Sequence, residues 1–448
     1  MPEDCTDSQK HRFEGAKAYA AKRVFDGDCI LEDHAVLVSS GLIVDVVAVS
    51  ELPSDFPILW QEDSTILPGL IDAHMHFMRW EGPLFLAYGV TTIRDTGNQL
   101  EWILQCRELW RGQTSPRIFS LGPLLDGLNI HHPLVTRGIQ DHTSGVEAVR
   151  ETLAAGVDGI KLYASVQPEW IPGMVRESHG GGRKVSMHCS KHGVLVAGNA
   201  GVDEFYHHDG ILADVWPERP NGWLNVWGKK GFSDTWDRQQ KVADEIAEIG
   251  MTATPTLAYW DSQWRMRSQV GPTPEESQYM PTDLFKWAAA ESDPQLGGEW
   301  KRGLEAAQRF TGALFERGVS ILAGSDTPCG GILPGQSLWR EMELLVRSGM
   351  STVEAIKSAT SAVADFLECP ELGRLRPGAF ADLVSVRGNP FQKIPVRPEL
   401  GLVVLDGTVY GPQKLLERAE APDEAWRKDP WGRQFAQHWE RRSRRSSA

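Results

Sequence analysis

The chain has 448 residues, with 46 lysines and arginines against 60 aspartates and glutamates, which gives a formal net charge of -14. This length allows a large core and more than one structural unit. The negative charge argues against nucleic acid or an anionic membrane surface as the main partner. Hydrophobic residues make up 41% and charged residues 24% of the chain, as in ordinary soluble globular proteins. No apolar run approaches the length of a membrane span.

Cysteine usage and the first residues predict a cytoplasmic location. Six cysteines are scattered along the chain without paired spacing, which argues against a disulfide framework and for a reducing compartment. The first residues are polar and acidic, and no apolar stretch of the signal-peptide type follows them. We therefore expect a cytoplasmic protein without disulfide bonds.

Taken in order, the chain begins with a polar, charged stretch, residues 1–16, that is expected to be a mobile tail. Short β-branched runs separated by turn signals occupy residues 17–66, and similar runs return in residues 369–415. Two such segments on either side of a central region predict one small β-sandwich built from both ends of the chain. The alternative is two unrelated β-appendages.

The central region, residues 67–368, alternates strand-like and helix-like segments. Strand-like runs occur at 89–95, 117–120, 159–163, 184–188, 204–208 and 320–326, and helical periodicity occurs at 100–110 and 145–155. Repeated strand–helix units over this length imply a parallel sheet, and the (β/α)8 TIM barrel is its commonest closed form. The predicted fold class is therefore α/β, a barrel plus a β-sandwich, with the active site at the carboxyl ends of the strands.

The first strand of this region carries a metal-binding signal. Residues 67–76 read Leu-Pro-Gly-Leu-Ile-Asp-Ala-His-Met-His, in which a Pro-Gly turn feeds a short buried strand that ends in His74 and His76. Alternate residues of a strand point to the same face, so both imidazoles can bind one metal ion. An isolated His-x-His pair is as often structural as functional, and the prediction therefore depends on further ligands.

Further polar residues do end the later strands. Lys161 lies inside an apolar strand, and His188, then His207 or His208, and finally Asp326 follow. Taken singly, each has a structural explanation, such as a lysine whose amine reaches solvent, a hydrogen-bonded core histidine or an Asx turn. Their joint occurrence at the strand ends of one βα succession favours a metal site.

With these residues in place, the chain resembles the amidohydrolase superfamily, in the branch of the imidazolonepropionases and Xaa-Pro dipeptidases. The resemblance extends from Ala18 to Tyr410. It rests on five motifs, at residues 67–76, 89–95, 156–163, 323–326 and 372–384. Together these motifs are specific for the superfamily and weak for the substrate.

The resemblance implies a binuclear site. The implied ligands of the two divalent metal ions are histidines, an aspartate and an N-carboxylated lysine: His74, His76 and Asp326 for one ion, His188 and His207 for the other, and Lys161 bridging both. Zn2+ is the expected metal, with Mn2+ or Co2+ as alternatives. A hydroxide bridging the metals would attack the carbonyl carbon of an amide-type C–N bond, and Asp326 would pass the proton to the leaving amine.

The sixth strand departs from the family pattern, because it ends in two adjacent histidines where the family shows one. The residues that lead into it, 201–203, favour His207 as the ligand. Adjacent strand residues point to opposite faces, so only one of the two can face the metals. His208 would then pack outside the barrel or line the substrate pocket.

Candidate substrate-binding residues are less specific. Arg94 ends the second strand, where it could bind a substrate carboxylate, and a salt bridge with Asp95 or another acid is the alternative. Tyr163 follows the bridging lysine by two residues and should face the same way. His131 and His132 follow the third strand and could contact the substrate carbonyl oxygen, or could be a surface pair.

Two further regions give weaker predictions. Many of the 17 tryptophans lie between Trp216 and Trp300, which predicts either an aromatic lid over the barrel or a subunit interface. Residues 416–448 are expected to form a solvated C-terminal tail with no nucleic-acid role.

The complete ligand set favours a metal-dependent amidohydrolase with a small-molecule substrate, no nucleic-acid or membrane partner, and a homo-oligomeric state. Dipeptides, N-acyl amino acids, lactams, ureas, carbamates and aryl amides all remain open as substrates. One alternative is a mononuclear deaminase or cyclic-imide hydrolase in which Lys161 is unmodified. Another is a non-catalytic scaffold that keeps the fold and assembles through its surface.

Overall fold

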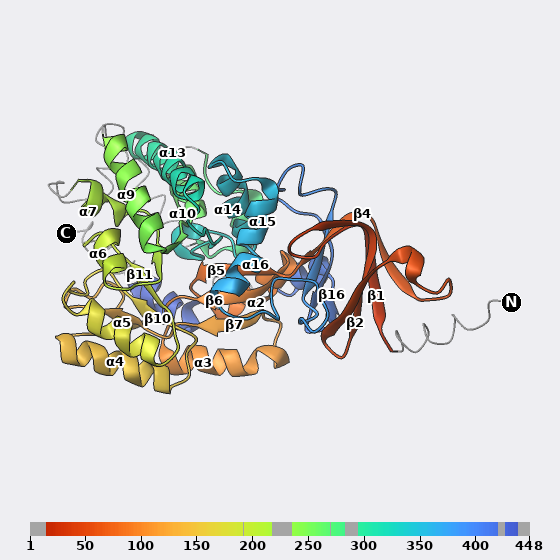
Figure 1. Cartoon of the computed structure of the whole chain (residues 1–448), viewed down its shortest axis with the longest axis horizontal. Helices are drawn as coiled ribbons and strands as arrows, with labels where there is room; N and C mark the ends of the chain where they lie inside the picture. The colour runs from red at the N-terminus through yellow and green to blue at the C-terminus, as the bar shows by residue number, and fades with distance from the viewer. Residues whose placement is uncertain are drawn as a thin grey trace.

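The computed structural model describes residues 15–190, 192–216, 235–268, 270–282, 294–419 and 426–437. The expected N-terminal tail therefore lies almost wholly outside the described residues. The described strands form three sheets, of which the largest lies at one end of the molecule, on the right of Figure 1. Helices surround the other two sheets (Figure 1). Within the described ranges, no helix combines the length and hydrophobicity needed to cross a membrane.

The strands are β1 (Lys17–Phe25), β2 (Ile30–Ser39), β3 (Leu42–Ala48), β4 (Ile58–Pro68), β5 (Leu70–Met75), β6 (Val90–Asp95), β7 (Arg117–Ser120), β8 (Leu124–Asp126), β9 (Thr136–Gly138), β10 (Ile160–Leu162), β11 (Val185–His188), β12 (Glu204–Tyr206), β13 (Thr252–Thr254), β14 (Leu383–Arg387), β15 (Leu400–Leu405) and β16 (Thr408–Tyr410). The α-helices are α2 (Gly82–Ala87), α3 (Leu100–Leu109), α4 (His142–Ala154), α5 (Ile171–Gly180), α6 (Val194–Asn199), α7 (Ile211–Val215), α9 (Trp236–Ile249), α10 (Leu257–Arg267), α11 (Pro274–Tyr279), α13 (Pro294–Glu316), α14 (Gln336–Arg347), α15 (Thr352–Ser358), α16 (Ser361–Phe366) and α17 (Pro412–Glu417).

The largest sheet has seven strands in the order β16-β15-β14-β4-β1-β2-β3. It joins both ends of the chain, because β4 pairs with β1 on one side and with β14 on the other. Alternate residues of β1 enter different hydrophobic clusters, with Tyr19 and Ala21 in one and Ala18 and Ala20 in another. Both faces of the sheet are therefore covered at this strand. The terminal segments fold together as expected, and the sandwich itself stays a prediction.

The other two sheets are parallel, with strand orders β5-β6-β7 and β13-β12-β11-β10-β8-β9. Strands β6, β7, β10, β11 and β12 lie within the predicted strand-like runs, and α3 and α4 lie where helical periodicity occurs. The chain therefore has a mixed α/β fold with parallel strands, in agreement with the alternation in its sequence.

The segment after α13 lies between the two parallel sheets. Residues 320–326 are predicted as a strand but form only an isolated bridge, between Ala253 and Ile321. The backbone nevertheless bonds on both sides of the segment. The N–H of Leu322 donates to the carbonyl of Ala253 (2.9 Å), and the N–H of Asp326 donates to the carbonyl of His74 (2.7 Å). These bonds hold Asp326 beside the end of β5.

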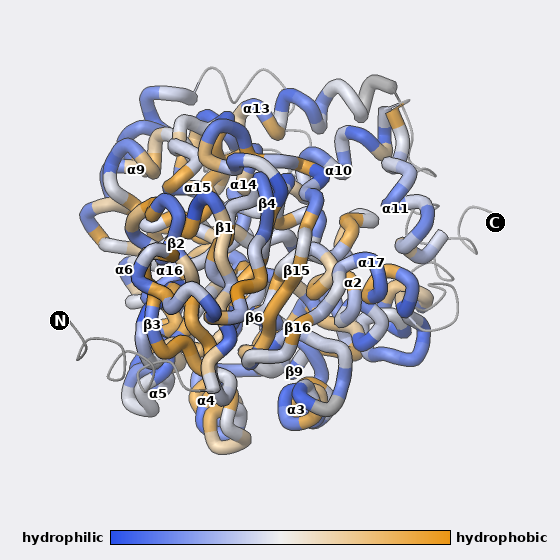
Figure 2. The backbone as a smooth tube through the Cα atoms, turned by 90° about the vertical axis from the view of Figure 1, so that its right-hand side faces the viewer, coloured by the Kyte–Doolittle hydropathy of each residue, from blue (hydrophilic) through white to orange (hydrophobic). Residues whose placement is uncertain are grey.

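The turn before β5 depends on glycine. The N–H of Gly69 donates to the carbonyl of Asp382 (2.8 Å), and a Cβ at position 69 would lie 2.1 Å from Oγ1 of Thr91. Glycine therefore lets the chain enter β5 close against β6. Every residue of β5 and β6 is buried, as suits strands covered on both faces. Figure 2 shows that the buried and exposed elements differ in hydropathy. Strand β15 is hydrophobic, whereas helix α11, at the edge of the view, is mostly hydrophilic.

The C-terminal residues correct one prediction. Residues 416–448 are predicted as a solvated tail, but residues 426–437, termed the C-terminal segment below, are folded and include a helical run at 430–437. Trp426 and Trp431 are 1% and 2% exposed, and Phe435 packs against the same core. Large aromatic side chains supply enough apolar surface to hold a short segment against the protein, although charged residues surround them in the sequence.

Candidate metal centre

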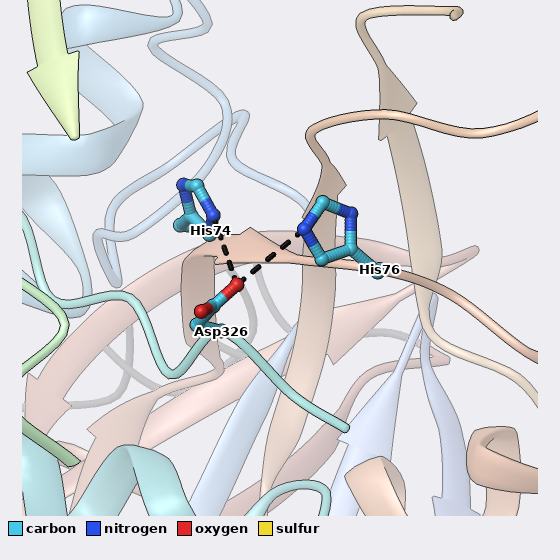
Figure 3. Close-up of side chains that lie close together, drawn as sticks. All are labelled: His74, His76 and Asp326. Carbon is cyan, nitrogen blue, oxygen red and sulfur yellow. Dashed lines mark ion pairs between the residues drawn. The ribbon is translucent and has the colours of Figure 1, made fainter. Parts of the chain in front are cut away.

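Two histidines and an aspartate converge at the end of β5. The Nε2 atoms of His74 and His76 lie 3.2 Å and 3.4 Å from Oδ1 of Asp326. Candidate metal-binding atoms from all three side chains lie within 4.8 Å of one another. Figure 3 shows both imidazoles directed at the same carboxylate oxygen. These three predicted ligands are therefore close enough to bind one ion.

His74 has the surroundings of a metal ligand. It is fully buried, and neither ring nitrogen has a hydrogen-bond partner among the described residues. Burial, with a contribution from Lys161, holds the pKa of His74 well below its usual range, so the imidazole is neutral near pH 7 and able to bind a metal. Leaving a buried polar atom without a partner is costly, and a cation between Nε2 of His74 and Asp326 would remove this cost for that nitrogen. The residues therefore fit a divalent metal ion.

Two residues beside the cluster hold Asp326 close to His74. The Asp72 carboxylate accepts hydrogen bonds from N (3.0 Å) and Oγ (2.5 Å) of Ser325 and from the backbone N–H of His74 (3.2 Å). A Cβ at Gly324 would lie 2.6 Å from Cβ of His74, so only glycine allows this approach of the two segments. The sequence predictions did not include Asp72, although it lies inside the motif that contains both histidines.

A second pair of histidines lies beside the first cluster. The ring centroids of His188, at the end of β11, and His207, after β12, are 4.5 Å apart, and His207 is 4.9 Å from His74. Nδ1 of His207 is 2.6 Å from Oγ1 of Thr256, and Nε2 of His188 is 3.0 Å from Oδ2 of Asp209. These bonds orient both rings and leave the second nitrogen of each for a metal.

Lys161 lies in β10 near both pairs of histidines. It is 1% exposed, and its Nζ is 3.6 Å from the ring centroid of Tyr206. Its charge contributes to lowering the pKa values of His74 and His207, and that of Asp326 acts on Lys161 in turn. Burial lowers the pKa of Lys161 to about 7, so much of the amine is neutral near neutral pH. A neutral amine is the form that can take up carbon dioxide.

Arg94 is paired inside the protein in this structure, and its role in substrate binding stays a prediction. The side chain is 1% exposed, and its Nη1 and Nη2 donate to Oε2 of Glu204 (2.6 Å) and Oγ of Ser186 (2.8 Å). The guanidinium also lies 4.9 Å from the ring centroid of Phe366. The structure therefore shows the alternative prediction, a salt bridge with another acid, with Glu204 as the partner.

His208 lies away from the candidate metal cluster, and the suggestion that it binds substrate stays a prediction. Its Nε2 is 2.8 Å from Oγ1 of Thr311 in α13, and its ring packs edge-on to Phe310 at 5.3 Å. Burial lowers the pKa of His208 to about 3, so the ring stays neutral. His207 and His208 point to opposite sides, which agrees with the choice of His207 as the ligand.

Successive ring contacts form a closed circuit that includes all four candidate histidine ligands. The centroid distances are 5.5 Å for His74–His76, 4.4 Å for His76–Trp431, 5.0 Å for Trp431–His132, 5.8 Å for His132–Tyr163, 5.0 Å for Tyr163–His188, 4.5 Å for His188–His207 and 4.9 Å for His207–His74. The structure thus brings His132 and Tyr163 to the site, as predicted.

His131 lies beside this ring circuit. Its ring is 6.2 Å from that of Tyr163, and its Nδ1 is 3.6 Å from Oδ2 of Asp126, with about half of the side chain exposed (49%). Trp431, from the C-terminal segment, is the one member of the circuit that the sequence predictions missed. The available signal was the i, i+4 spacing of Trp431 and Phe435, which places both rings on one face of a short helix.

The described tryptophans of the range 216–300 pack inside the protein. Trp260 and Trp300 are 3% and 2% exposed, with ring centroids 5.0 Å apart between α10 and α13. Trp236 lies against Arg309, whose guanidinium carbon is 3.5 Å from the ring centroid. These contacts stabilise helix packing, and the lid or subunit interface stays a prediction. Trp223, Trp227 and Trp287 lie outside the described residues.

Comparison with known proteins gives matches at both ends of the chain. Residues 18–58 match a family model described as NagA composite domain, and residues 305–411 match one described as amidohydrolase family. Ochratoxinase of Aspergillus niger is 36% identical over 93 residues, which is 20% of this chain and only 18% of that enzyme.

Solved structures resemble nearly the whole chain. Bottromycin amidohydrolase has a TM-score of 0.69 at 22% identity and covers 96% of this chain and 94% of its own. A Xaa-Pro dipeptidase with bound methionine has a TM-score of 0.65 at 21% identity and covers 88% of this chain and 100% of its own. At these identities, the likeness shows a shared fold.

Proposed function

We propose that this chain, which belongs to the amidohydrolase superfamily, is a binuclear metal-dependent hydrolase of amide-type C–N bonds. The observation that carries the proposal is the convergence of His74, His76 and Asp326, with both nitrogens of the buried His74 lacking a hydrogen-bond partner. The matched family models and the hydrolases among the similar structures support a hydrolytic enzyme.

The proposed fold is a (β/α)8 barrel with a β-sandwich, and the domain boundaries are those expected from the sequence. Backbone bonds from residues 320–327 to both β13 and β5 support closure of the two parallel sheets into a barrel. The pairing of β4 with β14 supports a sandwich formed by both ends of the chain.

In the proposed site, His74, His76 and Asp326 would hold one metal ion, and His188 and His207 would hold the other. Lys161, as its N-carboxylate, would be a ligand shared by both. Zinc is the expected metal because four of the ligands are imidazoles. The lowered pKa of Lys161 supports carboxylation, since an ammonium beside two cations would be repelled. When bound, the metals would lower the pKa of water to about 7 and polarise the substrate carbonyl.

The protein's own residues supply the proton transfer and the orientation of the substrate. Asp326 accepts a proton from the attacking water and passes it to the nitrogen of the leaving amine. His131, His132 and Tyr163 lie together beside the candidate ligands, where an imidazole N–H or phenol O–H can donate to the substrate carbonyl oxygen. Such donors stabilise the negative charge that develops on this oxygen during attack.

The proposed substrates are dipeptides, N-acyl amino acids, carbamates or aryl amides. The names of the similar proteins support this range, because they include a Xaa-Pro dipeptidase and an amidohydrolase of bottromycin. We also propose a cytoplasmic homo-oligomer with no nucleic-acid or membrane partner. The net charge of -14 supports the absence of a nucleic-acid or anionic-membrane partner, and the five free cysteines in the described part of the chain support the cytoplasmic location.

Metal content per chain tests the proposal. Protein prepared without chelator and supplied with bicarbonate should contain about two divalent metal ions per chain by plasma mass spectrometry. It should then hydrolyse a member of an amide, dipeptide and carbamate panel. One metal ion with unmodified Lys161 would instead indicate the mononuclear deaminase or cyclic-imide hydrolase. No bound metal, even after addition of zinc or manganese, would leave only the non-catalytic scaffold.

A further inference from the structure

We infer that the C-terminal segment, residues 426–437, is part of the metal centre, and that Trp431 is a positioning residue for His76. The inference rests on the proposed function in one respect, that His76 binds a metal ion. Its basis is a set of contacts between this segment and three loops that follow parallel strands.

The first contact is between Trp431 and His76 themselves. The two ring centroids are 4.4 Å apart with an interplanar angle of 41°. Both side chains are buried, with exposures of 2% and 6%. On its other side, Trp431 lies 5.0 Å from His132 and 5.4 Å from Phe435. The indole therefore limits the directions in which the His76 ring can turn.

The second contact acts through the carbonyl of Gly97, in the loop after β6. This oxygen accepts a hydrogen bond from Nε1 of Trp431 (2.6 Å) and lies 3.2 Å from Nδ1 of His76. When Nδ1 of His76 donates to this carbonyl, the proton-free Nε2 faces Asp326, at 3.4 Å from its Oδ1. Trp431 thus fixes the acceptor that selects the metal-binding tautomer of His76.

Asp95 supports the same carbonyl from the end of β6. Its Oδ1 accepts the N–H of Gly97 (3.2 Å), and its Oδ2 accepts the N–H of Phe77 (2.7 Å), the residue after His76. A Cβ at Gly97 would lie 2.3 Å from Cδ2 of Leu124, so the loop has little room to move. The carbonyl is therefore held on the side of β6 by Asp95 and on the outer side by Trp431.

Further contacts fasten the C-terminal segment to the loops after β5 and β8. The carboxylate of Asp429 accepts hydrogen bonds from N (2.7 Å) and Nε (2.9 Å) of Arg79, three residues beyond His76. The side-chain oxygen of Gln434 accepts the N–H of Leu134 (3.0 Å). Together with the Trp431–Gly97 bond, these contacts join three loops beside the candidate ligands. A segment that only covered apolar surface would not need these polar bonds.

Trp431→Phe tests the inference, because it keeps an aromatic ring and removes the N–H donor. Trp339→Phe is the matched control, since Trp339 is also fully buried and donates its Nε1–H to a backbone carbonyl, that of Tyr88 (2.9 Å), without contact to the candidate ligands. Zinc affinity of the apo-protein is measured by competition with a chelator, and stability by urea unfolding of the apo-protein.

We expect Trp431→Phe to weaken zinc binding about tenfold, within the range for residues that orient a ligand. Trp339→Phe should change the zinc affinity less than twofold. Its free energy of unfolding in the apo-protein should fall about as much as that of Trp431→Phe. Asp429→Asn, which loosens the segment without touching His76, should also weaken zinc binding. Unchanged zinc affinity in Trp431→Phe and Asp429→Asn would overturn the inference and leave a purely structural role for the segment.

The failure of the proposed function would look different. In that case wild-type protein itself would bind no zinc, and the inference would be judged by the tautomer of His76. Nitrogen chemical shifts of the apo-protein should show a proton on Nδ1 of His76 in the wild type and in Trp339→Phe. A mixture of tautomers in Trp431→Phe would support the positioning role, and an unchanged tautomer would contradict it.

Discussion

Two clusters of buried polar residues lie on the same strands and differ in how their atoms are paired. In the first cluster, Glu204 accepts hydrogen bonds from Arg94 (2.6 Å), Ser186 (2.6 Å) and Thr254 (2.5 Å). In the second, at the strand ends, the buried His74 has no hydrogen-bond partner among the described residues on either ring nitrogen. Strand β11 contributes Ser186 to the first cluster and His188 to the second, and β12 contributes Glu204 to the first and leads into His207 of the second.

The difference separates a structural cluster from a candidate site. Both oxygens of the Glu204 carboxylate are paired, which stabilises one arrangement of the strands and leaves this carboxylate no capacity for a ligand, although Nε of Arg94 has no hydrogen-bond partner among the described residues. Buried groups whose partners are absent carry a cost that a bound ion can remove. Residue type alone does not distinguish the two clusters, because both contain a cation in an apolar strand, Arg94 in β6 and Lys161 in β10.

The largest expected effect comes from the second cluster. Asp326→Asn should lower kcat about 1,000-fold, because it removes the general base while keeping the shape of the side chain. The free energy of unfolding of the apo-protein should change by less than about 1 kcal/mol, since among the residues that the structure describes the carboxylate pairs only with the two imidazoles and is not part of an ion pair with a lysine or arginine. Full activity of this variant on a substrate of the wild type would refute the proposed mechanism.

The first cluster should respond in the opposite way. Arg94→Met leaves the carboxylate of Glu204 buried without its cation, and should lower the free energy of unfolding by about 3–5 kcal/mol in urea. Adding Glu204→Gln removes the unpaired charge, so the double variant should recover much of this loss. Metal content should stay at the wild-type level. A stable Arg94→Met protein with only a raised KM would show instead that Arg94 binds substrate.

The smallest effect is expected from His208, in comparison with its neighbour His207, whose side chain points to the opposite side. His208→Phe should cost about 1 kcal/mol of stability, the value of its hydrogen bond to Thr311, and leave metal content unchanged. His207→Phe should lower metal content by one ion per chain. Measuring both variants by plasma mass spectrometry sharpens the comparison, and equal metal loss in the two would contradict the assignment of His207.

The sequence predicted the elements near the site well where local signals were strong. The Pro-Gly turn and the His-x-His pair place His74 and His76 at the end of a buried strand, because period-two alternation and turn chemistry depend on neighbouring residues only. The approach of Asp326 was predicted from its place at the end of a βα succession, although residues 320–326 form no regular strand.

Other features depend on contacts that local patterns do not contain. Arg94 and Glu204 are 110 residues apart in the chain, and nothing near Arg94 indicates that its partner is protein and not substrate. Trp431 lies in a range dominated by charged residues, and its contact with Gly97 spans 334 residues. The sequence predicted that the two terminal segments fold together only because both carry similar strand patterns.

The attachment of the C-terminal segment has a consequence for the order in which the protein is made. Asp429 and Arg79 are separated by 350 residues. At roughly 5–20 residues per second, a ribosome needs on the order of 20–70 s to add this length. Throughout that interval, the nascent chain already contains His74 and His76 but not the segment that packs against them. The candidate metal centre can therefore acquire its contacts with this segment only after residue 431 has been added to the chain.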